Sequence, residues 1–232
     1  MRIIRRLLPI LFVSISIFVS AAYTSGQNRG VLGEILHRMD EHNKALQSLK
    51  ADVRREIVNA QLGETDVSTG RTSYVPGSAK SSMRIRIDWV TPREEHLAIT
   101  GDTYDMYIPK SKARYVGSVK SVKSGSKVPA SALAFMSMSR KQLTDNYLVD
   151  FVREETVAGS KTWHLVLTPR ANADYKFADL WVDANGMPIQ AKITRLNDDS
   201  TTILLTNLQK NVTINKADFK LQVPSGITIT KG

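Results

Sequence analysis

The residues best suited to metal binding or acid–base catalysis are the four histidines of the sequence, and their spacing favours neither role. His37 and His42 lie five residues apart in a predicted helix, so they do not share a face as ligands at i and i+4 would. His96 and His164 fall in predicted strands, with no acidic residue at ligand spacing. We therefore expect no metal site.

Acidic residues are the second group that could do chemistry, and several occur as doublets: Glu94-Glu95, Glu154-Glu155 and Asp198-Asp199. Such doublets are typical of hydrated turns. The sequence contains no Gly-x-Ser-x-Gly motif, phosphate loop or dinucleotide fingerprint. We expect no enzyme, no catalytic residue and no cofactor, although a pair of carboxylates brought together from distant strands, as in a glycosidase, stays open.

The first 22 residues have the order of an export signal, with arginines, then an apolar stretch from Leu7 to Val19, then small residues. We expect cleavage between about residues 21 and 26, which leaves residues 27–232 as one domain. The chain has no cysteine, the residue that a bacterial lipid anchor requires. We therefore expect a soluble periplasmic protein without a lipid anchor.

The chain is basic, with a formal net charge of +10. Lysine and arginine are spread along it and form no block of five or more. This distribution is typical of a solvated basic surface. Together with the expected export, it argues against a nucleic-acid partner.

The elements that must position any site are mostly strands. Apolar residues recur at helical spacing over residues 29–47, and the period then changes to two. Met83–Val90 alternates most regularly, which indicates a strand with one buried face. We count about eleven strands in antiparallel order, a Lys/Ser/Gly-rich loop over residues 110–128 and short helices within residues 129–145. The predicted class is mainly β (α+β), with a single curved antiparallel sheet covered by an N-terminal helix and a short helical lid.

Five segments carry recognisable motifs in order: Arg86–Pro92, Leu97–Pro109, Trp163–Pro169, Phe177–Val182 followed by Asn185-Gly186, and Asp218–Ile229. In order and spacing they are similar to motifs of the LolA-type periplasmic outer-membrane lipoprotein carriers, the lipoprotein-sorting family. The resemblance extends over residues 30–229. It implies a half-open β-barrel closed by helices, with an apolar cavity for the acyl chains of lipoproteins.

The resemblance also implies partners. Such carriers accept lipoproteins from an inner-membrane lipoprotein-releasing ABC transporter, deliver them to an outer-membrane receptor and use no cofactor; we expect a monomer. The family often has Arg-Pro before the aromatic strand, where the arginine fastens the lid, but this chain has Val75-Pro76. Arg86 matches a second common arginine position and is a candidate latch or polar rim residue.

Strand alternation supplies the candidate ligand contacts, and a register slip of one residue would exchange the faces. The predicted lining consists of Met83, Ile85, Ile87, Trp89, Leu97, Ile99, Tyr104, Met106, Trp163, Leu165, Leu167, Phe177 and Trp181. The predicted lid residues are Phe135, Met136 and Met138. For each of them, ordinary core packing is the alternative. Two other functions stay open: an envelope sensor or regulatory domain, and a carrier of a lipid other than lipoprotein.

Overall fold

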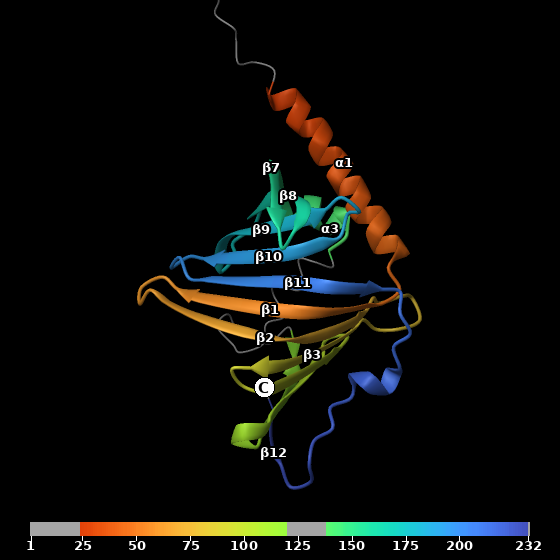
Figure 1. Ribbon diagram of the computed structural model, residues 1–232, viewed down its shortest axis with the longest axis vertical. Helices are drawn as coiled ribbons and strands as arrows, with labels where there is room; N and C mark the ends of the chain where they lie inside the picture. Colours follow the sequence, from red (N-terminus) through yellow and green to blue (C-terminus); the bar gives the residue numbers. More distant parts are fainter. Residues whose placement is uncertain (1–23, 120–137, 232) are drawn as a thin grey trace, which may run out of the picture.

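The computed structural model describes residues 24–119 and 138–231, with side chains from Arg29 onward (Figure 1). The predicted signal, Phe135 and Met136 lie outside the described residues. The α-helices are α1 (Thr24–Ala45) and α3 (Arg140–Asn146), and η1 (Pro109–Ser111) and η3 (Lys216–Phe219) are short 3₁₀ turns. The strands are β1 (Leu49–Asn59), β2 (Glu64–Val75), β3 (Arg84–Thr91), β4 (Glu95–Thr100), β5 (Thr103–Ile108), β6 (Ala113–Ser118), β7 (Tyr147–Val157), β8 (Ser160–Pro169), β9 (Tyr175–Asp183), β10 (Pro188–Arg195), β11 (Ser200–Lys210) and β12 (Thr228–Lys231).

All twelve described strands form one sheet, in the order β12-β6-β5-β4-β3-β2-β1-β11-β10-β9-β8-β7. Neighbours pair antiparallel except β12, which runs parallel to β6. The sheet is curved and open, with α1 alongside its β7–β11 part (Figure 1). The predicted fold class is confirmed. The loop expected over residues 110–128 is wrong for residues 113–118, which form β6.

The strand alternation seen in the sequence separates the two faces of the sheet. Ile85, Ile87 and Trp89 of β3 are buried on one face, where Ile85 pairs with Ile99 and Ile87 with Leu97. We call this the inner face because it carries the main apolar core, to which α1 also contributes Ile35, Leu36 and Met39. The opposite face is called the outer face.

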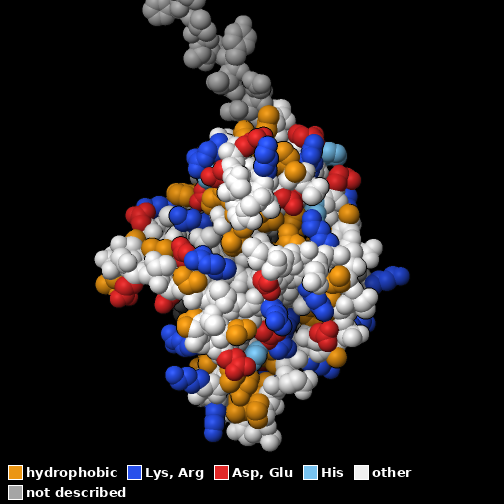
Figure 2. Space-filling model, in the orientation of Figure 1, with side chains coloured by type: hydrophobic (Ala, Val, Ile, Leu, Met, Phe, Trp, Pro, Cys, Tyr) orange, Lys and Arg blue, Asp and Glu red, His pale blue; other side chains and the backbone are white. Residues whose placement is uncertain are grey.

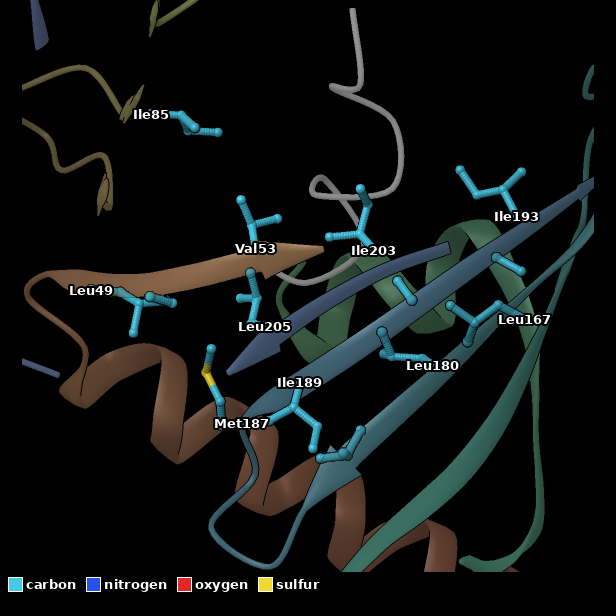
Figure 3. Close-up of a cluster of buried hydrophobic side chains, with 14 of the residues drawn as sticks. Leu49, Val53, Ile85, Leu167, Leu180, Met187, Ile189, Ile193, Ile203 and Leu205 are labelled. Carbon is cyan, nitrogen blue, oxygen red and sulfur yellow. The ribbon is translucent and has the colours of Figure 1, made fainter. Parts of the chain in front are cut away.

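The inner face runs across most of the sheet as one continuous apolar layer. Figure 3 shows Leu49, Met187 and Ile189 near α1, with Val53, Ile203 and Leu205 further along the sheet. On the surface, lysine and arginine side chains are scattered over the face that Figure 2 displays. The apolar side chains therefore gather in the interior, where their burial supplies the main stabilisation of the fold.

Helix α1 is held to the β9–β10 turn by a close approach of the two backbones. Arg38 Nη1 donates a hydrogen bond to the Ala184 carbonyl at 2.9 Å. Gly186, in the same turn, has φ +80°, and a Cβ added there would lie 2.2 Å from the Arg38 carbonyl oxygen. Only glycine fits both the backbone conformation and the contact.

Candidate functional site

The inner face gathers most of the residues that were predicted to line a ligand site. Nine of them are buried in the main core cluster, namely Ile85, Ile87, Trp89, Leu97, Ile99, Tyr104, Met106, Leu165 and Leu167. Met83 and Trp163 are partly buried and pack against this cluster. These positions form one apolar surface; their contact with a ligand stays a prediction.

Two predicted lining residues lie on the other face. On β9 the core cluster takes Ala178, Leu180 and Val182, so Phe177 and Trp181 project from the outer face. Trp181 stacks on His164 with ring centroids 4.5 Å apart. The structure therefore corrects the prediction for Phe177 and Trp181, because the small Ala178 rather than the aromatic residues marks the inner face.

Arg86 also lies on the outer face. Its Nε donates to Asp88 Oδ1 at 2.8 Å, and its Nη1 donates to the Lys220 carbonyl at 3.1 Å. Nearby, the Arg84 guanidinium lies 5.5 Å from the ring centroid of Phe219, which is buried. Arg86 thus fastens the C-terminal segment to the outer face, on the opposite side of the sheet from the predicted lining.

Met138 is the predicted lid residue that the structure describes. It is partly buried and packs against the core, and its carbonyl accepts a hydrogen bond from Asn43 Nδ2 of α1 at 2.9 Å. One residue later Ser139 caps α3, and Leu143 of α3 is fully buried. The start of α3 is therefore anchored both to α1 and to the core.

Both strand histidines contact carboxylates, which the sequence did not predict. His164 Nε2 lies 2.7 Å from Asp179 Oδ1, and its Nδ1 lies 3.0 Å from Glu155 Oε1 without the geometry of a hydrogen bond. His96 makes hydrogen bonds with two carboxylates, at 2.6 Å between Nδ1 and Asp88 Oδ1 and at 3.1 Å between Nε2 and Glu94 Oε1. Both groups are on the outer face. No group of three or more metal-binding side chains occurs within the described residues.

Arg55 places a charged side chain on the inner face, which sequence reasoning missed. The Arg55 guanidinium lies 4.4 Å from the ring centroid of Trp89, and its Nη2 donates to Ser68 Oγ at 3.1 Å. Burial lowers the pKa of Arg55, although the carboxylates of Glu95 and Asp66 act in the opposite direction. Period-two alternation places Arg55 on the same face as Val53, so the sequence pattern alone is sufficient to predict a charged side chain on this face.

The family of the chain follows from its sequence. The family model described as outer membrane lipoprotein carrier protein LolA matches residues 78–222. The chain belongs to the LolA family. The match covers β3 to β11, so it includes much of the inner face that the geometry singles out. No curated protein matches the sequence.

Solved structures share the LolA-like fold. An uncharacterized conserved protein from Thermus thermophilus has 12% identity and a TM-score of 0.55, covering 87% of this chain and 99% of that chain. MucB has 16% identity and a TM-score of 0.55, and the match covers 83% of this chain and 63% of the MucB chain. The MucA/MucB complex of Pseudomonas aeruginosa has 16% identity and a TM-score of 0.50, and the match covers 82% of this chain and 60% of that chain. At these identities the likeness concerns the fold alone, and this chain spans less than two thirds of the MucB chains.

Membership of the LolA family confirms the resemblance that the sequence motifs indicated. Four of the five motif segments lie inside residues 78–222, and Asp218–Ile229 extends beyond it. The family model is described as that of a carrier protein. Within the described residues, no helix has the length and hydropathy needed to cross a membrane.

A tyrosine pair where β7 begins gives a pH-dependent prediction. Tyr147 Oη and Tyr175 Oη lie 2.9 Å apart, and burial, followed by the hydrogen bond with Tyr147, raises the pKa of Tyr175 above its ordinary value of 10.0. As the pH rises past that value, the unfolded chain loses this proton first, so the free energy of unfolding should fall. Urea midpoints at pH 8 and at about pH 10.5 should differ less for Tyr175→Phe than for the wild type. Equal pH dependence of the two proteins would contradict this assignment.

Proposed function

We propose that this chain is a periplasmic carrier that binds the acyl chains of lipoproteins on the inner face and carries them from the inner to the outer membrane. The observation that carries the proposal is the continuous apolar inner face of a LolA-family sheet. Acyl chains are unbranched and apolar, and their binding needs apolar area rather than directed polar contacts. No metal or cofactor is needed for this task.

A carrier must also release its cargo, which limits the net affinity. Burial of one CH₂ group contributes about 0.8 kcal/mol, so a 16-carbon chain could gain about 13 kcal/mol. We propose that Phe135, Met136 and Met138 form a lid that occupies the inner face in the empty protein. Loading then exchanges one buried apolar contact for another, so the net affinity becomes modest.

The remaining parts of the proposal concern the route. Residues 1–22 would direct export and be removed, leaving residues 27–232 in the periplasm. The partners would be an inner-membrane lipoprotein-releasing ABC transporter and an outer-membrane receptor. The similarity of residues 1–22 to export signals supports the first step, and the description of the family as an outer-membrane lipoprotein carrier supports the second.

Uptake of a diacylated lipopeptide tests the proposal. The protein purified from the periplasm should bind a synthetic dipalmitoyl lipopeptide from dilute detergent as a one-to-one complex that native mass spectrometry detects. The same peptide without acyl chains should not bind. If the acylated and unacylated peptides behave alike, the proposed function is wrong.

An envelope sensor is the second candidate, and the likeness to MucB favours it. MucB is seen in complex with MucA, and the chain shares its fold over 83% of its own length. The two candidates differ in their partner. Cross-linking in the periplasm should recover a lipoprotein or an ABC transporter for a carrier, whereas recovery of a single-span regulatory membrane protein alone would favour the sensor. Lipid analysis of the same sample would reveal a cargo other than lipoprotein.

A further inference from the structure

Arg55 places a charged group against Trp89 on the largely apolar inner face. Toward the α1 end of β1, the inner-face residues before Arg55 are Leu49, Ala51 and Val53, all buried. Toward the same end of β3, Ile85 and Ile87 precede Trp89. The charged group therefore lies at one end of an apolar surface. Arg55 lies six positions after Leu49, which corresponds to about 20 Å of strand.

Two hydrogen-bond donors of this group have no partner among the described residues. Arg55 Nε and Trp89 Nε1 are both buried and make no hydrogen bond there, and Trp89 is only 1% exposed. A buried donor without a partner destabilises the folded state. Such groups are rare in native proteins, and each one calls for an explanation such as a bound molecule. Among the described residues, no acceptor oxygen makes a hydrogen bond with either donor.

The charges nearby select the kind of acceptor. Glu95 pairs across the strands with Trp89, so it lies on the inner face, and the carboxylates of Glu95 and Asp66 both interact with Arg55. These two carboxylates balance the guanidinium and repel a further anion. A neutral carbonyl oxygen accepts hydrogen bonds without that repulsion. The local charge therefore favours an ester over a phosphate or a free fatty acid.

We propose that Arg55 and Trp89 form a binding site for the acyl-ester oxygens of a diacylglyceryl group, with its chains directed along the inner face toward α1. The inference rests on the proposed function and adds the orientation of the cargo. It applies equally to a diacylated lipoprotein and to a diacyl phospholipid, because both carry the same ester group. The acyl chains supply the affinity, and the two donors supply the preference for an ester.

Comparison of an ester lipid with an ether lipid tests the site. The probes are dipalmitoyl phosphatidylglycerol and its dihexadecyl ether analogue, which lacks the carbonyl oxygens but keeps the chains and the head group. Binding is followed as displacement of N-phenyl-1-naphthylamine from the protein purified from the periplasm. The wild type should bind the ester lipid about tenfold more tightly, which corresponds to about 1.4 kcal/mol of hydrogen-bond energy.

Arg55→Gln should lose most of the preference for the ester lipid and keep the wild-type affinity for the ether lipid. Trp89→Phe keeps an aromatic ring and removes the N–H group, so it should lose part of the preference. The matched control is Arg54→Gln on the outer face, where Arg54 pairs with Glu56 at 2.6 Å; it should keep the full preference. The melting temperature of each variant is measured in parallel, so that lipid preferences are compared between folded proteins.

The outcomes separate this inference from the proposed function. Equal wild-type affinity for the two lipids, or an unchanged preference in Arg55→Gln, overturns the ester site and leaves acyl-chain binding intact. If Arg55→Gln no longer binds the ether lipid, the ester site is also overturned, because Arg55 would then support the apolar face itself. Failure of the wild type to bind either lipid would overturn both.

Discussion

Replacement of Leu180 by aspartate is expected to unfold the protein. Leu180 is 0% exposed at the centre of the core cluster, next to Leu165 on β8 across the strands. A carboxylate there would be buried among apolar side chains, and such changes lower the free energy of unfolding by more than about 4 kcal/mol. Urea unfolding followed by circular dichroism should show little or no folded baseline for Leu180→Asp.

Leu148→Asp is the matched control. Leu148 is 50% exposed on the outer face of β7, so the same substitution leaves its carboxylate in water. Its free energy of unfolding should stay within about 0.5 kcal/mol of the wild type. Similar losses in the two variants would contradict the assignment of the inner and outer faces.

Gly186→Ala is expected to lower the free energy of unfolding by about 3 kcal/mol. The alanine would adopt φ +80°, and its Cβ would lie 2.2 Å from the Arg38 carbonyl oxygen. The backbone of α1 would have to move away from the β9–β10 turn, which would weaken the Arg38–Ala184 hydrogen bond as well. Urea unfolding measures the loss, and hydrogen exchange of the α1 amides reports whether the helix detaches.

Gly159→Ala separates the effect of the positive φ angle from the effect of the contact with α1. Gly159 has φ +81°, but no described atom lies within 4 Å of the added Cβ. The free energy of unfolding of this variant should fall by only about 1 kcal/mol, the strain of an alanine at positive φ. If Gly186→Ala loses no more than Gly159→Ala, the contact with α1 contributes nothing to stability.

Alternation predicted the sheet well because most inner-face residues are larger and more apolar than their outer-face neighbours. On β3 the inner residues are Ile85, Ile87 and Trp89, and most of the outer ones are charged. On β9 this rule fails, since the inner Ala178 is small whereas the outer Phe177 and Trp181 are aromatic. Strand pairing with β8 decides the face there, and pairing is a long-range property that local composition does not contain.

The same limit explains the other omissions. Strand β6 has a Lys/Ser-rich neighbourhood, yet Arg114 pairs with Asp105 of β5 through two hydrogen bonds, which favours strand pairing there. His164 and Asp179 lie fifteen residues apart and meet only because β8 and β9 pair. Arg86 was placed correctly in a strand, but its contact with Lys220 depends on the path of the C-terminal segment.

Strand β7 ends the sheet, and in the described part of the chain no strand covers its free edge. A flat exposed edge would let two copies join into one continuous sheet through their backbones. Here the register shifts between Phe151 and Arg153, and Asp150, Arg153 and Glu154 are exposed along the strand. An irregular, charged edge opposes such stacking. If the apolar inner face is uncovered during loading, as the proposed function requires, this edge opposes polymerisation of the exposed copies through their backbones.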